Sequence, residues 1–478
     1  MNPLLILHSP SQKPLFIPGL TYKDMIQYAA ELRVDPNEVS IDKRVDEIIT
    51  IMNLHHCKNR RITEYPPTRG ELGCDLRRLS IAIEIVHLPA LFVIDEPTLD
   101  FEPAISVKII ECLQTLARRG HIVLCSMSKP SSSEFSMLDR VVLLTEGHTI
   151  YAGPPSKVEE HFCSPEMGYV RKKGVDLVDF TSDVCSGIER PVTMRVAELP
   201  SIMQEKFEAS PLFSVPSKDE TNVHAFSKEF FHWFGYTANT HSVSTHIKRF
   251  AVIMRRAFMT KFKDTRSLQG YFFASFVMSS IVGYLQYGQA TYGNYALSLF
   301  GIPYKNTTNV GSTMFFLSLF TQCYFFNDSN AYCQKLQLFR YEQASGCNNA
   351  PAFFLSTVIS EVPWAIAFAF VFCNIIYFMV QFYGSEQDYG FYVSLLIMSA
   401  LVGLSSTVMY CCFFRKELVV RDMFFFSLIV VVLLSGFPFS QASMPDYMIQ
   451  FSSIIPTRYF FLNLFYTFVL SFLHPCLM

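Results

Sequence analysis

The residues best suited to chemistry in this sequence are two adjacent carboxylates, Asp95 and Glu96. They follow the short apolar run at residues 90–94, which predicts a buried β-strand. At the end of such a strand, Asp95 can hold a Mg²⁺ ion, and Glu96 can orient and deprotonate a water that attacks a γ-phosphate. The alternative is a solvated acidic turn that only ends the strand, and the pair alone does not decide between the two.

The predicted elements around this pair alternate between helix and strand. Thr21 is expected to cap a helix, with Asp24 completing the capping box, and a further helix is expected to follow Asp75. Pro103 opens another helix, and residues 121–126 predict a second buried strand. Two apolar runs around a glycine turn predict a β-hairpin at residues 141–144 and 149–152. This order of elements predicts an α/β fold for the N-terminal part.

The composition limits the class of protein. The 478 residues are 50% hydrophobic and 15% aromatic, which is too apolar for an ordinary soluble enzyme. The 39 Lys and Arg residues nearly balance the 41 Asp and Glu residues, so no overall basic field exists to attract nucleic acid, and none is expected as a partner. The 13 cysteines show no repeated C-x-x-C pairing, so neither a zinc site nor a disulfide framework is predicted.

Charges are dense as far as Arg266 and sparse afterwards, where long apolar runs predict an all-α, multi-pass membrane domain. Lys and Arg residues cluster before the first span, between the second and third, and between the fourth and fifth. The positive-inside rule therefore places the N-terminal part in the cytoplasm. The predicted spans are residues 268–285, 311–326, 352–380, 391–413 and 423–437.

The chain is accordingly divided into an N-terminal α/β domain, a linker and a membrane domain with five or six helices, at residues 1–162, 163–245 and 246–478. Residues 245–262 form a basic amphipathic stretch, expected either as a helix along the inner leaflet, with membrane lipids as partners, or simply as a positive-inside flank of the first span. Its apolar residues, such as Ile253, are expected opposite basic residues such as Arg256. Inside the third span, Glu361 is either functional or paired with a basic residue from the flank of the first span, and pairing is favoured.

Four segments together resemble the nucleotide-binding domain of the G (white, pleiotropic drug resistance) subfamily of ABC transporters. They are Arg78-Leu79-Ser80-Ile81-Ala82-Ile83-Glu84, Leu91-Phe92-Val93-Ile94-Asp95-Glu96-Pro97-Thr98, Lys129-Pro130-Ser131-Ser132 and Tyr151-Ala152-Gly153-Pro154. In the membrane part, residues 341–346 are similar to the family's loop before the third span. The resemblance implies a partial P-loop NTPase domain of the ABC type, and ATP-dependent transport of lipids, sterols or amphipathic compounds.

The resemblance also implies roles for individual residues. Asp95 matches the Walker B aspartate that holds Mg²⁺, and Glu96 matches the catalytic glutamate for ATP hydrolysis. Gln12 matches the Q-loop glutamine near the metal, and Ser128 stands at the position of the switch histidine. The family signature Ser-Gly-Gly-Glu, which binds nucleotide, aligns with Leu72-Gly73-Cys74-Asp75.

Several positions depart from the family pattern. Leu72 removes a hydroxyl that would bond the γ-phosphate, Cys74 crowds a glycine position, and Ser128 cannot carry charge. No G-x-x-x-x-G-K-[ST] sequence occurs, so the phosphate-binding loop and its strand are expected to be missing, which would leave apolar sheet edges open. The sixth membrane helix is also expected to be absent.

These features favour two functions. The first is one half of an ATP-dependent transporter, paired with a second half-transporter or with another copy of this chain. The second is a catalytically inactive pseudo-transporter or regulatory subunit. The membrane spans exclude a soluble ATPase of the same superfamily.

Overall fold

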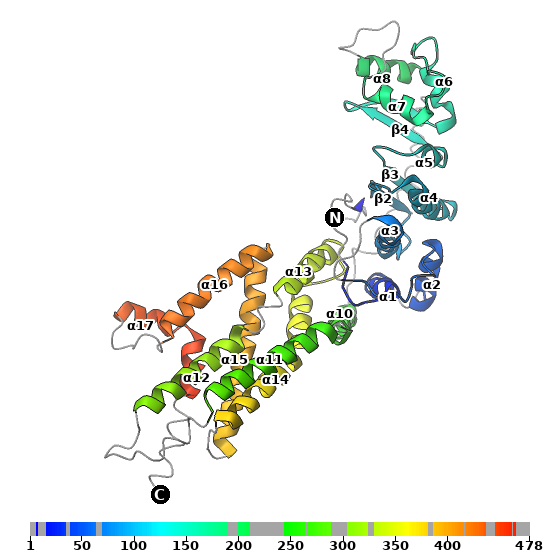
Figure 1. Cartoon of the computed structure of the whole chain (residues 1–478). Helices are drawn as coiled ribbons and strands as arrows, with labels where there is room; N and C mark the ends of the chain where they lie inside the picture. The colour runs from blue at the N-terminus through cyan, green and yellow to red at the C-terminus, as the bar shows by residue number, and fades with distance from the viewer. Residues whose placement is uncertain are drawn as a thin grey trace. The chain divides into compact units, whose positions relative to one another are not determined.

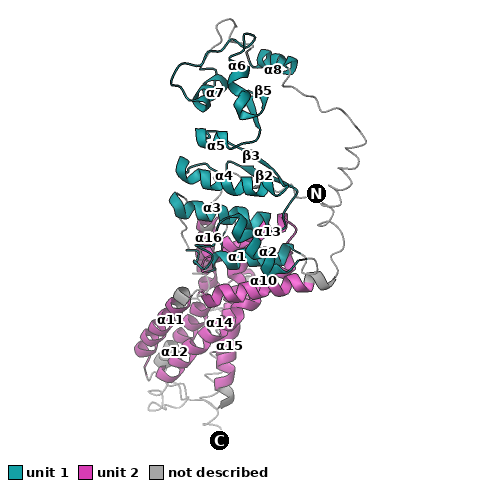
Figure 2. Cartoon of the chain, turned by 90° about the vertical axis from the view of Figure 1, so that its right-hand side faces the viewer, with its two compact units in different colours: residues 1–16, 20–242 teal, residues 17–19, 243–478 magenta. Residues whose placement is uncertain are grey.

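The computed structural model describes residues 6–7, 16–34, 39–63, 69–188, 199–210, 243–263, 265–287, 304–323, 329–380, 386–414, 416–435, 445–460 and 462–464. The chain divides into two compact units, shown in different colours in Figure 2. The first unit comprises residues 1–16 and 20–242, and the second comprises residues 17–19 and 243–478.

The first unit contains a parallel sheet of three strands in the order β1–β2–β3. These are β1 (Ile6–Leu7), β2 (Leu91–Asp95) and β3 (Ile122–Ser126). Two of the strands were predicted, each to within one residue. Phe92 and Ile94 of β2 are buried, as expected of alternate residues on a covered face. Ile122 and Leu124 of β3 are exposed, so the sheet presents apolar side chains at this strand.

Helices α1 (Tyr22–Arg33), α2 (Ile41–Ile51), α3 (Gly70–Ile85) and α4 (Pro103–Arg118) accompany the sheet. The capping box is confirmed: Thr21 N donates to Asp24 Oδ2 at 2.9 Å, and Asp24 N donates to Thr21 Oγ1 at 3.1 Å. The start of α3 was predicted wrongly, because it begins at Gly70 and not after Asp75. Tertiary packing outweighs the low helix propensity of its glycines, and Asp75 therefore lies inside the helix.

The predicted hairpin is formed by β4 (Val141–Thr145) and β5 (His148–Gly153), which pair in antiparallel fashion. The short helices around it are α5 (Ser132–Ser136), η1 (Pro155–Lys157), α6 (Val158–Phe162), α7 (Leu177–Cys185) and α8 (Leu199–Ala209). Phe180 of α7 and Phe207 of α8 join one buried cluster with Tyr151 and Phe162. The described helices within the expected linker thus pack against the hairpin, because they carry apolar anchors.

The second unit is helical (Figure 1). Its helices are α10 (Val243–Lys263), α11 (Thr265–Leu285), α12 (Tyr304–Cys323), α13 (Ser329–Ala344), α14 (Ala350–Val380), α15 (Glu386–Phe413), α16 (Glu417–Leu434) and α17 (Asp446–Ser452). Helix α14 packs against α10, α11 and α15. Its residues Phe368, Phe372 and Ile376 share a buried core with Phe315 of α12.

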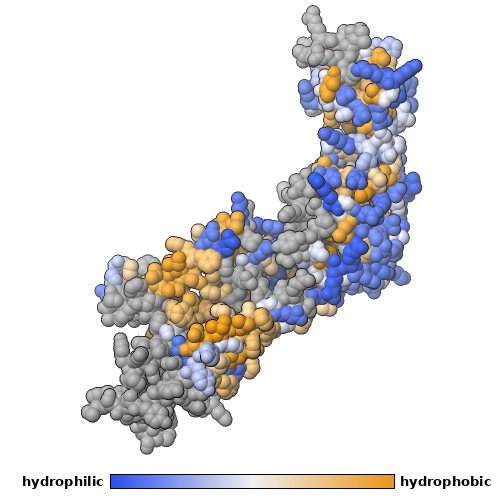
Figure 3. Space-filling view, viewed as in Figure 1, coloured by the Kyte–Doolittle hydropathy of each residue, from blue (hydrophilic) through white to orange (hydrophobic). Residues whose placement is uncertain are grey.

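Among the described residues, three helical segments are long and apolar enough to cross a membrane: Leu268–Leu285, Ala350–Val380 and Tyr389–Phe413. They correspond to three of the five predicted spans. The other two predicted spans fall largely on α12 and α16, which are not among these three segments, and they stay predictions. Apolar side chains gather on the outside of this unit in Figure 3, as expected of a surface that faces lipid.

Candidate functional site

Asp95 and Glu96 lie where β2 ends, at the edge of the sheet where parallel strands present their carboxyl ends. Asp95 pairs in register with Ser126, the last residue of β3. The hydroxyl of Ser126 donates to Asp95 Oδ1. The backbone N–H of Glu96 donates to Ser126 Oγ at 3.1 Å and to its carbonyl oxygen at 3.2 Å. Ser126 therefore fixes both acidic residues at the strand end.

The backbone of Glu96 has a φ of 48°, in the left-handed region that favours glycine. Such a conformation in a non-glycine residue costs on the order of 1 kcal/mol and is frequently found at functional sites. Glu96 and Asp95 are both partly exposed. The strained turn thus presents two carboxylates together at one edge of the sheet.

Of the other predicted site residues, the structure brings Ser128 to the same edge of the sheet and places the signature segment in α3. Ser128 is exposed and follows the end of β3 by two residues, so the chain brings it to the same edge as Asp95. Gln12 lies outside the described residues. Leu72, Gly73 and Cys74 lie in the first turns of α3, where Cys74 Sγ is 3.8 Å from the carbonyl oxygen of Ile105. Sequence reasoning missed Ser126, although its place at the end of a neighbouring parallel strand could have indicated it.

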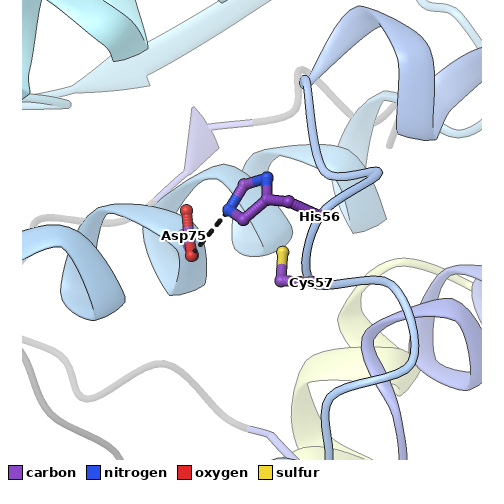
Figure 4. A group of neighbouring side chains, drawn as sticks. All are labelled: His56, Cys57 and Asp75. Carbon is purple, nitrogen blue, oxygen red and sulfur yellow. Dashed lines mark hydrogen bonds and ion pairs between the residues drawn. The ribbon is translucent and has the colours of Figure 1, made fainter.

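The carboxylate of Asp75 is buried and is held by basic groups (Figure 4). Arg78 donates to Oδ1, and His56 Nε2 lies 3.1 Å from Oδ2. The guanidinium of Arg60 lies 3.7 Å from Oδ2. Asp75 therefore anchors the turn that carries His56 to α3, and its carboxylate is already occupied by protein partners.

Ligand atoms of His56, Cys57 and Asp75 lie within 4.8 Å of one another, the closest approach to a metal-binding group among the described residues. Nitrogen, sulfur and oxygen donors of this kind suit zinc. Burial and the nearby Asp75 carboxylate, however, raise the pKa of the Cys57 thiol to about 11. Two arginines next to the carboxylate also oppose a cation. The group is better explained as an ion-paired cluster than as a metal centre.

A second polar site lies in the helical unit, around Glu361 of α14. Its side chain is only 1% exposed, and its two oxygens lie 2.9 Å from Lys261 Nζ of α10 and 3.0 Å from Lys335 Nζ of α13. The predicted pairing of Glu361 with a basic residue from the flank of the first span is confirmed by Lys261. Lys335 was not predicted as a partner. One buried carboxylate thus joins three helices.

Glu342 of α13 makes a comparable junction. Both guanidinium nitrogens of Arg256 donate to its carboxylate, one of them at 2.8 Å, and Asn348 Nδ2 donates to Oε2 at 2.9 Å. Arg249 donates to the carbonyl oxygen of Gly346 at 3.2 Å. Residues 341–346, singled out in the sequence, therefore bind α10. Because both carboxylates are bonded to α10, a displacement of α10 would also displace α13 and α14.

Comparison with known proteins gives a family match within the helical unit. Residues 248–469 match the family of ABC-2 type transporters. The chain is 25% identical over 421 residues to ATP-binding cassette sub-family G member 8 of Rattus norvegicus, covering 84% of this chain and 56% of that protein. It is 33% identical over 178 residues to ABC transporter G family member 7 of Arabidopsis thaliana, covering 37% of this chain and 24% of that protein.

A third relative, Protein white of Ceratitis capitata, is 21% identical over 466 residues. That match covers 94% of this chain and 64% of the relative. The chain thus spans little more than half the length of several of the curated relatives it matches.

Proposed function

We propose that this chain, a G-family ABC transporter by its ABC-2 type membrane domain and its relatives, is one half of an ATP-dependent transporter for lipids, sterols or other amphipathic compounds. The observation that carries the proposal is the membrane domain itself. Three span-length helices lie in the part of the chain that matches ABC-2 type transporters. Two buried carboxylates tie this bundle to the basic helix α10.

For the ATP-dependent step, the support comes from the edge of the sheet in the first unit. Carboxylate oxygens are the ligands that Mg²⁺ prefers, and Asp95 has one oxygen bonded to Ser126 and a second that can face a metal. In the proposed roles, Asp95 holds Mg²⁺, Glu96 polarises the attacking water, and Ser128 bonds the γ-phosphate. Gln12 would lie near the metal, as the family resemblance implies.

The proposed nucleotide site also needs a phosphate-binding loop. The 478 residues hold no G-x-x-x-x-G-K-[ST] sequence. In the paired half-transporter that we propose, the nucleotide held by the phosphate-binding loop of the partner would face Leu72-Gly73-Cys74-Asp75 of this chain. A second copy of this chain is the other partner to test.

A second candidate function is a catalytically inactive subunit, and one observation favours it. The carboxylate of Asp75, at the last position of the signature segment, is bonded to Arg78 and His56. Combined with a serine at position 128, this leaves few groups that can sense a γ-phosphate. Such a subunit would keep the membrane domain and lack ATP hydrolysis.

Retention of Mg-ATP separates the two functions. The full chain is purified alone and after co-expression with a complete G-family half-transporter, in the native form and as Glu96→Gln. The exposed Glu111→Gln on α4 serves as a matched control. We expect retained ATP only in the co-expressed complex, and more of it with Glu96→Gln than with either other form.

Two results would contradict this expectation. Retention by the chain alone would show that it needs no partner to bind nucleotide. Absence of retention and of ATP hydrolysis in every preparation would leave the inactive subunit as the function.

A further inference from the structure

Two buried cysteines from different helices meet in the helical unit. Cys333 lies in α13, and Cys411 lies near the C-terminal end of α15. Both are present as thiols, and both belong to one buried cluster that also contains Leu404 and Val420. Because α13 packs against α15, two thiols that are distant in the sequence come together.

The sulfur of Cys411 lies beside the helical turn that carries Cys333. Cys411 Sγ is 3.7 Å from the carbonyl oxygen of Ser329, the first residue of α13. In an α-helix this carbonyl oxygen accepts from the N–H four residues later, which here belongs to Cys333. Helical side chains lean towards the N-terminus, so the Cys333 thiol covers the same turn. The two thiols are accordingly within hydrogen-bond reach of each other.

A third thiol shows that this pair lies close to the surface of the unit. Cys412 follows Cys411 in α15 and is exposed. It interacts electrostatically with Cys333 and with the guanidinium of Arg340, which is itself exposed. A small neutral oxidant therefore needs to pass only the outermost side chains to reach the buried pair.

We propose that Cys333 and Cys411 form an oxidative modification site, at which hydrogen peroxide produces a disulfide between α13 and α15. Cys333 lies near the N-terminus of α13, where the helix dipole favours negative charge, so its sulfur is the first to attack. The thiol gives up its proton, the sulfur bonds to one peroxide oxygen, and the O–O bond breaks to leave a sulfenic acid and water.

The second step joins the two helices. The sulfur of Cys411 attacks the sulfenic sulfur of Cys333, so that the S–S bond forms as the S–O bond breaks. The departing hydroxyl takes the thiol proton of Cys411 and leaves as a second water. The two thiols together lose two electrons, and one hydrogen peroxide is reduced to two waters.

The disulfide would act on a helix that already holds other helices together. Glu342 of α13 is bonded to α10, and Lys335 of α13 pairs with α14. A bond from Cys333 to α15 would add a covalent link to the candidate span Tyr389–Phe413. The oxidised form should therefore be more stable, because the cross-link also restricts the unfolded chain.

The proposal is tested on the full chain in phosphatidylcholine nanodiscs. The reduced protein is treated with hydrogen peroxide, the remaining thiols are alkylated, and its peptides are identified by mass spectrometry. We expect a reductant-sensitive peptide pair that joins Cys333 to Cys411 within one chain. The midpoint of thermal unfolding should rise by several degrees on oxidation and return to its original value with dithiothreitol.

Three variants provide the controls. Cys333→Ala and Cys411→Ala should each lose the peptide pair and the rise of the midpoint. Cys373→Ala, which removes another buried thiol in α14, should keep both. The comparison of oxidised with reduced native protein needs no variant, so a variant that fails to fold does not affect it.

The proposal is overturned if peroxide leaves Cys333 and Cys411 unlinked, including oxidation that stops at a sulfinic acid. It is also overturned if Cys333 is found joined to Cys412 or to a second copy of the chain. A disulfide that leaves the midpoint unchanged would contradict the stabilisation of α13. None of these readouts depends on ATP hydrolysis.

Discussion

Glu361 of α14 and Lys335 of α13 form an ion pair of 3.0 Å within the membrane domain, and the carboxylate is almost completely buried. Lys261 of α10 completes the group from the other side at 2.9 Å. Because two lysines pair with one carboxylate, loss of Glu361 leaves both positive charges uncompensated, whereas loss of one lysine leaves the carboxylate paired with the other. Helices α10 and α13 meet again at Glu342.

Replacing Glu361 by Ala should therefore destabilise the second unit more than replacing either lysine. Removing one partner of a buried ion pair typically costs about 3–5 kcal/mol of unfolding free energy. Lys335→Ala should cost less, because Lys261 continues to pair with the carboxylate. The measurement is thermal or denaturant unfolding in detergent, with the exposed Asp422→Asn on α16 as control. Equal stability of the Glu361 and Asp422 variants would show that the group does not hold the helices together.

Gly403 of α15 should not tolerate a side chain. A Cβ atom at this position would clash with the carbonyl oxygen of Gln322 and lie 2.6 Å from its Cα, so α12 and α15 would have to separate. Overpacking of this kind costs about 1–3 kcal/mol. Gly390→Ala, on the same helix with open space around its Cβ, is the matched control. We expect a lower unfolding temperature for Gly403→Ala only; a native-like value would mean that the two helices are less tightly packed.

In the first unit, Asp75→Ala should be strongly destabilising, by about 3 kcal/mol. The guanidinium of Arg78 is buried and would lose its carboxylate partner, while the carbonyl oxygens of Met52 and Asn53, each at 3.2 Å, continue to accept from it. Asp75→Asn should cost less, because the amide oxygen still accepts one hydrogen bond. Unfolding by denaturant measures both, with the exposed Asp139→Asn as control. The result that contradicts this role is an Asp75→Ala protein as stable as the control.

His87 should make the first unit sensitive to mild acid. Burial, followed by the positive charge of Arg33, lowers its pKa to about 4 from the usual 6.5. Because the unfolded state binds the proton first, its stabilising contribution is complete above about pH 6.5 and is lost as the pH falls towards 4, up to roughly 3 kcal/mol. His87→Gln should flatten this part of the pH profile of unfolding, whereas the exposed His55→Gln should not. An identical slope for His87→Gln and the native protein would assign the acid sensitivity to other groups.

Ser126 should act as a positioning residue for Asp95 and Glu96. Its hydroxyl donates to one and accepts from the other, so Ser126→Ala leaves both acidic residues less fixed. If the proposed ATP site is correct, we expect Ser126→Ala in the Glu96→Gln background to raise the Mg²⁺ concentration needed for half-maximal ATP retention several-fold. Ser126→Thr, which keeps the hydroxyl, should restore it. An unchanged Mg²⁺ requirement would mean that Asp95 is positioned without Ser126.

Local features of the fold could be predicted because neighbouring residues create them. The capping box of Thr21 and Asp24 and the helix that starts at Pro103 need only a few consecutive residues. The hairpin around Gly147, whose φ is 84°, has the same origin. Three membrane spans were also predictable, since a run of apolar residues long enough to cross a bilayer is a property of the sequence alone.

The start of α3 shows where local reasoning ends. The sequence analysis expected this helix only after Asp75, and Gly70 and Gly73 lower the intrinsic helix propensity of its first turns. In the structure, the buried neighbours Cys74, Asp75 and Arg78 compensate through packing and ion pairing. As a result, a residue predicted to contact nucleotide is bonded to His56 from another part of the chain.

The sequence by itself determined that this protein has an N-terminal part with adjacent carboxylates at a strand end and a C-terminal part that enters a membrane. It also determined that a basic helix precedes the first span. Only the tertiary structure decided which cations of that helix pair with Glu342 and Glu361, and which remain exposed. Lys248, Arg256 and Lys261 have similar surroundings in sequence. Their roles differ because helices distant in the chain pack together and leave two buried carboxylates, which only cations on the facing side of α10 can neutralise.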